Sequence, residues 1–214
     1  MDTNLHNIYL FKALDAYPYE LEETIEALNY ALSYEPTNAK ALCLLAKIHS
    51  EQLGDYEIAK SLYAEALANN MEMASIYPDY LYALLANEDY EEALKLIDFA
   101  LKVKGTDKGV IYTIQGQIYE ALFTYKKALK SFKMAKKYAF NNGYISFLKA
   151  EKDRIKDKMP KKKTVIWMTI ILSLLVYFLI AFGEGITMMA LVWMIPALAI
   201  LTYTLMMHDW KENE

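Results

Sequence analysis

The sequence predicts an all-α protein: a solenoid of about four helix pairs with a capping helix, followed by two transmembrane helices. Three observations predict this class. Ala, Leu, Tyr, Glu and Lys recur at helical spacing through residues 1–158. A motif in that region returns at intervals of about 35 residues. Two long stretches near the C-terminus contain no charged residue.

The amino-acid composition excludes several other classes of protein. The chain has 214 residues, of which 55% are hydrophobic, and the excess over an ordinary soluble domain is concentrated at the C-terminal end. The 5 prolines and 7 glycines are too few for a fibrous chain or a long flexible linker. The lone cysteine, Cys43, leaves no internal disulfide and no cysteine-cluster zinc site.

An internal repeat divides residues 1–142 into similar units. Each copy has an aromatic or apolar residue, then a small residue, a large apolar residue and a second small residue at helical spacing. The copies begin at Tyr125, Tyr90, Tyr56 and, more weakly, Leu21. Because each unit has apolar residues on more than one face, it cannot bury them alone and must stack on its neighbours.

This pattern resembles the tetratricopeptide repeat, a helix–turn–helix unit of about 34 residues. The match covers residues 5–142, in units near 5–38, 39–73, 74–108 and 109–142. The fourth unit is the most specific, with Gly116 at the small-residue position of its first helix. Lys12 and Leu81 depart from the family pattern at that position, so we expect irregular packing there. Alternatively, the third unit begins its first helix at Pro78, where the missing N–H costs little.

In that family the first helix of each pair lines a concave groove that binds a peptide or a partner helix. The resemblance therefore implies a partner-binding groove with contributions from all four units. Its residues are Tyr9, Ala13, Lys40, Cys43, Lys47, Tyr82, Leu85, Thr113, Gln117 and Glu120. Tyrosines in such a groove supply rigid contact area with a polar tip. The alternative is that they only seal the interfaces between helices.

Residues 143–163 are expected to form a capping helix and a basic juxtamembrane segment. An apolar stripe runs along the helix and consists of Tyr144, Phe147, Leu148 and Ile155. The opposite face is charged, as in a helix that closes a solenoid with a solvated outer surface. After Pro160, three consecutive lysines lead into the first uncharged stretch: Lys161, Lys162 and Lys163.

Residues 164–207 are expected to form a transmembrane hairpin. The first stretch, 164–182, would be about 28 Å long as a helix, against a hydrocarbon core of about 30 Å. The second, 186–207, follows a Gly-Glu-Gly turn, and neither stretch has the polar face of a soluble helix. A re-entrant loop is the alternative. Trp193 and Pro196 predict a kink with the indole facing the first helix, or a packing surface for another membrane protein.

The flanking charges predict the orientation of this hairpin. Lysines precede the first span and the turn between the spans has no basic residue, and Lys and Arg near spans stay on the cytoplasmic side. We therefore expect a two-span membrane protein whose N-terminal domain and short tail, residues 208–214, are both cytoplasmic. The composition fits a bacterial inner membrane, and a eukaryotic organelle facing the cytosol would look similar.

Charge is sorted along the chain. Residues 1–94 contain 17 acidic and 4 basic residues, whereas residues 95–163 contain 6 acidic and 18 basic ones. One helical face gathers part of the positive charge in Lys126, Lys130, Lys133 and Lys137. Three roles are open for this face. It is a solvated surface, or it contacts anionic lipid. A contact with nucleic acid or ribosomal RNA is the third alternative and has less support from motifs.

Motifs for catalysis are absent from the sequence. The three histidines lie far apart, and no phosphate loop, dinucleotide fingerprint or nucleophile motif is present. We therefore expect no enzyme activity, no cofactor and no metal site. The sequence favours a membrane-anchored scaffold whose groove binds a protein or organises a membrane complex. The alternatives are a structural subunit that is bound through its hairpin, and an accessory factor for ribosomes or translocation.

Overall fold

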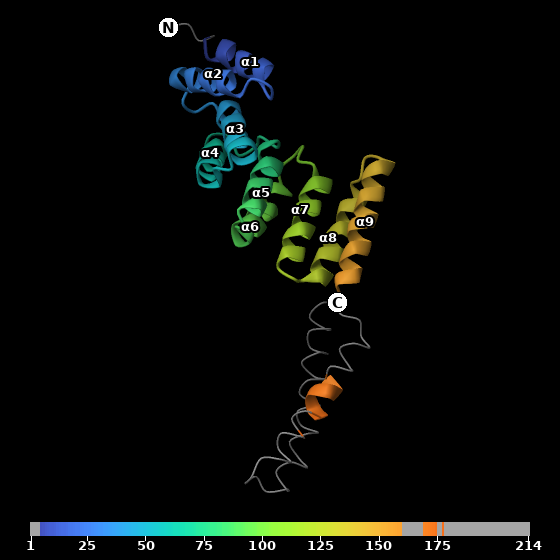
Figure 1. The fold of residues 1–214 in the computed structure, drawn as a ribbon. Coiled ribbons are helices and arrows are strands. Elements are labelled where there is room, and N and C mark those ends of the chain that lie inside the picture. The colour runs from blue at the N-terminus through green and yellow to red at the C-terminus, as the bar shows by residue number, and fades with distance from the viewer. Residues whose placement is uncertain (1–4, 160–168, 175–176, 178–214) are drawn as a thin grey trace, which may run out of the picture.

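The computed structural model describes residues 5–159, 169–174 and 177, and every regular element within them is helical (Figure 1). The helices are α1 (Leu5–Ala16), α2 (Leu21–Tyr34), α3 (Ala39–Ile48), α4 (Tyr56–Asn69), α5 (Ile76–Ala86), α6 (Tyr90–Ala100), α7 (Lys108–Ala121), α8 (Tyr125–Lys137) and α9 (Asn142–Lys158). After α3 the chain continues through a π-helical turn, η1 (His49–Leu53).

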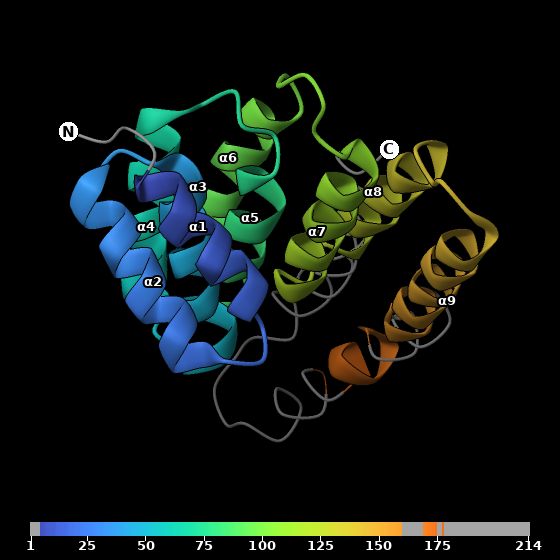
Figure 2. The same ribbon diagram turned by 90° about the horizontal axis from the view of Figure 1, so that it is seen from above.

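The helices pack as pairs that stack side by side (Figures 1 and 2). α1 packs against α2, α3 against α4, α5 against α6 and α7 against α8, and α9 then packs against α8. The first helices of successive pairs also contact each other, α3 with α5 and α5 with α7. These first helices therefore line one side of the stack, which we call the groove face.

Asparagine or aspartate caps begin two of the first helices and the capping helix. The side chains of Asn38, Asp107 and Asn141 each accept a hydrogen bond from a backbone N–H in the first turn of α3, α7 and α9. Such caps satisfy one of the four N–H groups that a helix start leaves unpaired. The third unit begins differently, because α5 starts at Ile76 and contains Pro78 in its first turn, where no N–H is needed.

Small residues bring the helices of the fourth pair together. A Cβ atom at Gly116 would lie 2.8 Å from Cε2 of Phe132, which is closer than two carbon atoms can approach. Phe132 itself is fully buried in α8, as are Ala128 and Ala135. Glycine is therefore required in α7 because the Phe132 ring occupies the space of a side chain.

The first unit packs closely with a different small residue, whereas α5 and α6 of the third unit pack less closely than the helices of the other three pairs. In α1, Lys12 is exposed and pairs with Glu23 of α2 at 3.0 Å, whereas the next residue, Ala13, is fully buried in the cluster that includes Leu28. The small residue of the first unit therefore lies one position later than the sequence alignment placed it. In α5, Leu81 is itself fully buried within the central core cluster.

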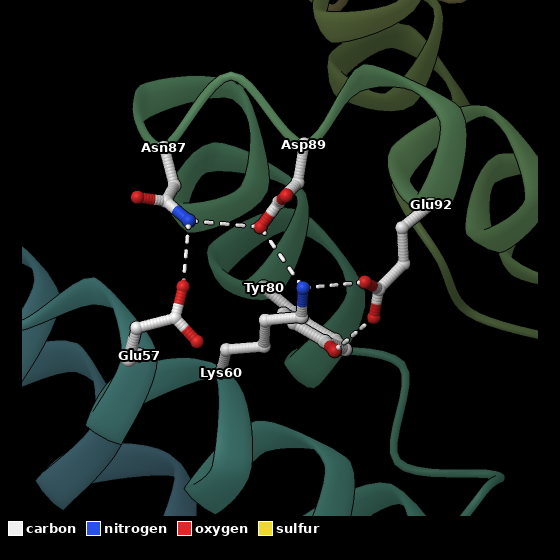
Figure 3. Close-up of polar contacts among 6 residues, drawn as sticks. All are labelled: Glu57, Lys60, Tyr80, Asn87, Asp89 and Glu92. Atoms are coloured by element: carbon white, nitrogen blue, oxygen red, sulfur yellow. Dashed lines mark hydrogen bonds and ion pairs between the residues drawn. The ribbon is translucent and has the colours of Figure 1, made fainter.

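A polar cluster joins the second and third pairs (Figure 3). The Lys60 ammonium of α4 lies 3.0 Å from Asp89 and 2.7 Å from Glu92. The Tyr80 hydroxyl donates to Glu92 at 2.9 Å, and the Asn87 amide donates to Asp89 at 2.9 Å. The hydrogen bonds that Lys60 donates to Glu92 and Asp89 raise the pKa of its ammonium group. The cluster therefore ties α4 to the turn between α5 and α6.

The expected hairpin lies almost entirely outside the described residues, as do Lys161, Lys162, Lys163, Trp193 and Pro196. Residues 169–174, which are described, are helical. Among the helices that the structure describes, none has the length and apolar character needed to cross a bilayer.

Candidate partner-binding groove

An ion pair lies at the middle of the groove face. The Lys47 ammonium of α3 donates to the Asp79 carboxylate of α5 at 3.3 Å and lies 3.8 Å from Glu51. Burial opposes the charged form of Lys47, but Asp79 and Glu51 outweigh it, so the pKa of Lys47 is raised. Burial also raises the pKa of the neighbouring Tyr17 hydroxyl. Residues of α3, of α5 and of the turn after α1 thus meet at one polar centre.

An open hollow lies at the N-terminal end of this face. Its volume is about 440 Å³, and it lies among α1, the α2–α3 loop, the start of α3 and the segment after α4. Its lining residues are Asn7, Leu10, Phe11, Leu14, Glu35, Thr37, Asn38, Ala39, Lys40, Asn69, Asn70 and Met73. Phe11 is 71% exposed and Leu14 is 51% exposed. Exposed apolar groups beside a hollow are typical of a surface that binds a partner.

The first-unit residues expected in the groove lie elsewhere. Ala13 is fully buried, so its side chain cannot contact a partner. Tyr9 stacks on Tyr30 and Tyr34 of α2, with ring centroids 5.1 Å and 5.9 Å away. Both placements follow from the one-residue shift described above, which puts Leu10 and Leu14 in their place. If Ala13 rather than Lys12 is aligned with Gly116, the sequence predicts Leu10 and Leu14 at these positions.

The second and third units present a mixture of exposed and buried positions. Lys40 is exposed and lines the hollow, and Tyr82 is 42% exposed, with Leu85 half-buried nearby on α5. Cys43 is buried, and burial raises the pKa of its thiol to about 12. Asp79 was missed by the sequence analysis, because nothing in its local sequence indicates that it faces Lys47.

The fourth unit is covered by the capping helix. The Thr113 hydroxyl lies 2.5 Å from the Tyr144 hydroxyl of α9. Glu120 accepts from Arg154 and from Lys158, each at 2.8 Å. Gln117 lies between them in sequence, and its buried Oε1 has no hydrogen-bond partner within the part of the chain that the structure describes. The groove is therefore open at α1 and filled by α9 at its other end.

The basic face lies on α8, outside the groove. Lys130, Lys133 and Lys137 are exposed and Lys126 is half-buried. Lys127 lies over the Tyr119 ring, 5.7 Å from its centroid. Among the described residues, no three His, Cys, Asp or Glu side chains are close enough together to hold a metal ion.

Comparison with known proteins supports the helical architecture. No protein-family model matches the sequence, and no curated protein matches it. Among solved structures, PilF of Pseudomonas aeruginosa has a TM-score of 0.63 at 18% identity, covering 72% of this chain and 70% of that one. MamA from Desulfovibrio magneticus has a TM-score of 0.59 at 17% identity, covering 73% and 90%. A further MamA structure gives 0.56 at 15% identity, covering 72% and 87%.

Residues 5–158 form a tetratricopeptide-like helical solenoid. The sequence resemblance to that repeat is thereby confirmed at the level of the fold. Because the solved neighbours share under a fifth of their residues with this chain, they establish its architecture and not its partner.

Proposed function

We propose that this protein is a membrane-anchored scaffold that binds a partner protein in its groove, with no catalytic step. The observation that supports the proposal is the open hollow at α1, where Phe11 and Leu14 are exposed beside Lys40. A solenoid normally places polar residues on its terminal face. Exposed apolar residues at that end therefore favour a role in binding.

The apolar and charged side chains of the groove limit the kind of segment that it can bind. Its open end presents the exposed apolar side chains Phe11 and Leu14 among polar ones. Its centre carries the Lys47–Asp79 ion pair, and α9 packs over its far end. A partner segment would therefore lie over α1 and α3 and place apolar side chains against Phe11 and Leu14. A short amphipathic helix or an extended peptide with two or three apolar anchors meets these requirements.

Membrane anchoring is the second part of the proposal. It rests on the uncharged stretches 164–182 and 186–207 and on the lysines before them. Anchoring would hold the solenoid at the cytoplasmic face, where bound partners could be organised into a complex. Carbonate washing should leave the protein in membranes, and protease added from the cytoplasmic side should remove residues 1–158. A protected N-terminal domain would contradict this orientation.

Groove binding can be tested by affinity capture of the full chain from its native membranes in mild detergent. In the Phe11→Ser/Leu14→Ser variant, recovery of the main partner should fall about tenfold or more, as expected for loss of central apolar contacts. The matched control is Ile58→Ser/Phe99→Ser, which removes two exposed apolar residues from the second helices α4 and α6. The control should capture the partner normally.

The same experiment separates the alternative in which the hairpin makes the specific contacts. If the Phe11→Ser/Leu14→Ser variant captures the partner as well as the unaltered chain, the groove does not bind it. A structural subunit that is held through residues 164–207 would then be favoured.

A further inference from the structure

Phe123 is an exposed aromatic residue in the turn between α7 and α8. It is 77% exposed, and its φ angle is +58°, in the left-handed region that strains residues with a Cβ. Its N–H donates to the Glu120 carbonyl at 2.9 Å, and the Thr124 N–H donates to the Tyr119 carbonyl at 2.8 Å. Helix ends with this pair of bonds usually have glycine at the left-handed position. The Phe123 ring meets Tyr125 edge-on, 6.3 Å between centroids.

The equivalent turns show that the fold does not require phenylalanine there. In the α5–α6 turn the corresponding residue is Glu88, with φ +63°, and in the turn before α4 it is Gly54, with φ +72°. The Glu88 turn has the same two hydrogen bonds. A glycine or a solvated charged residue therefore suffices for the turn. A strained, exposed aromatic side chain at this position is better explained by a contact outside the solenoid.

A lysine-rich helix follows this turn. α8 begins two residues after Phe123 and carries six lysines and no acidic residue. The nearest acidic residue along the chain, Glu120, is already paired with Arg154 and Lys158. The turn therefore combines an apolar tip with the start of a helix whose charged side chains are all lysines.

The described chain leaves the solenoid beside this turn. The Lys158 ammonium at the end of α9 lies 2.8 Å from Glu120 at the end of α7, three residues before Phe123. In Figure 1 the α7–α8 connection and the end of α9 lie at the same end of the stack. The sequence beyond α9 continues into Lys161–Lys163 and the uncharged stretch 164–182.

We propose that the α7–α8 turn is a membrane-surface contact, in which Phe123 enters the interface of an anionic bilayer while the α8 lysines bind its headgroups. The proposal rests on the membrane anchoring proposed above and adds a second, specific lipid contact to it. Aromatic side chains favour the headgroup level of a bilayer, and lysines are attracted to anionic leaflets. The observations favour a bilayer over RNA because the turn lies beside the end of α9. After α9 the sequence continues into the uncharged stretch 164–182.

A depth measurement on the full chain tests this contact. The Phe123→Cys variant is labelled with an environment-sensitive dye and reconstituted into vesicles of phosphatidylcholine with phosphatidylglycerol. The unaltered chain measures background labelling at Cys43, whose buried thiol should react slowly. The matched control is Glu88→Cys, which places the dye at the same position of a turn beside which Lys60 is already paired with Asp89 and Glu92.

The expected result is that nitroxide-bearing lipid quenches the dye at position 123 about threefold more than the dye at position 88. Raising the salt to about 1 M should weaken the difference, because it screens the lysines. Equal, weak quenching at both positions in protein that resists carbonate washing would overturn the turn contact and leave the anchor intact. Strong quenching at position 123 in protein that carbonate removes would support the turn contact and contradict the anchor.

A second variant separates contact from folding. Phe123→Gly relieves the left-handed strain, so the melting temperature of the solenoid should rise by about 2–4 °C. Protection of the Lys126–Lys127 region from trypsin by anionic vesicles should nevertheless fall about fivefold. Glu88→Gly should raise the melting temperature similarly and leave the protection unchanged. Unchanged protection in Phe123→Gly would overturn the proposal.

Discussion

The hydroxyl of Tyr144 in α9 lies 2.5 Å from the hydroxyl of Thr113 in α7. The contact joins the last helix to the groove face of the fourth unit, at a position where the sequence resemblance implies partner binding. Thr113 also donates to the Gly109 carbonyl at 2.9 Å, so Tyr144 supplies the hydrogen that the Thr113 oxygen accepts. The capping helix thus uses a partner-binding position for intramolecular packing.

Tyr144→Phe should loosen α9 without unfolding the solenoid. The variant removes one hydrogen bond between partly buried groups and leaves Thr113 bonded to Gly109, so the cost should be about 0.5–1.5 kcal/mol. Hydrogen exchange of the α9 amides should speed up relative to those of α3. Tyr138→Phe, at an exposed tyrosine that stacks on Tyr112, is the control and should leave α9 exchange unchanged.

Gly116→Ala should destabilise the fourth helix pair. Alanine has the better helix propensity, but its Cβ would lie 2.8 Å from the buried Phe132 ring, and overpacking of this kind costs about 1–3 kcal/mol. Chemical denaturation of the full chain in detergent micelles measures the change. Gly143→Ala, at an exposed position near the start of α9, should change the unfolding free energy by less than about 0.5 kcal/mol. A stable Gly116→Ala variant would show that Phe132 can move aside.

Lys60→Met should weaken the junction between the second and third pairs. It removes the cation that Asp89 and Glu92 share, and we expect a loss of about 1 kcal/mol in unfolding free energy. Lys95→Met is the matched control, because the exposed Lys95–Glu91 pair lies within one helix and should contribute little. Equal effects of the two substitutions would show that the Lys60 cluster adds nothing to an ordinary surface pair.

Acid should weaken the same junction. The Asn87 amide and the Lys60 ammonium lower the pKa of Asp89 below its ordinary value of 3.8. A lowered folded-state pKa stabilises the fold at pH values above 3.8, and this contribution is lost as the pH falls below that value. The drop in melting temperature between about pH 6 and pH 3 should therefore be smaller in Asp89→Asn. The control, Asp98→Asn on the exposed side of α6, should show the full drop.

Cys43 should be inert in the folded protein. Burial, with Asp79 nearby, raises the pKa of its thiol to about 12, so little thiolate exists near neutral pH. Iodoacetamide at about pH 8 should alkylate it at least about 100-fold more slowly in folded than in denaturant-unfolded protein. Fast alkylation of the folded chain would show that the groove face opens at α3.

The repeated spacing of small and large apolar residues was enough to predict the helix pairs. The copies beginning at Tyr56, Tyr90 and Tyr125 correspond to the starts of α4, α6 and α8. The prediction succeeds because each helix pair is a local unit. Its small residues determine how closely its own two helices pack, as Gly116 does opposite Phe132.

The groove was only partly predictable. A shift of one residue along α1 rotates the helix by about 100°, and this was enough to exchange the buried Ala13 for the exposed Leu14. Asp79 and Tyr144 reach their partners in other helices, Lys47 and Thr113. No local pattern specifies such pairings.

The order of the helices and their association in pairs were thus determined by the sequence itself, because they depend on contacts between residues close together in the chain. The sorting of charge is a property of the sequence alone. Only the tertiary structure decided which part of the groove face is open and which α9 fills. It also brought the Phe123 turn beside the end of α9. These features depend on how one pair is rotated against the next, and that rotation is set by side chains more than 30 residues apart, such as Glu120 and Lys158.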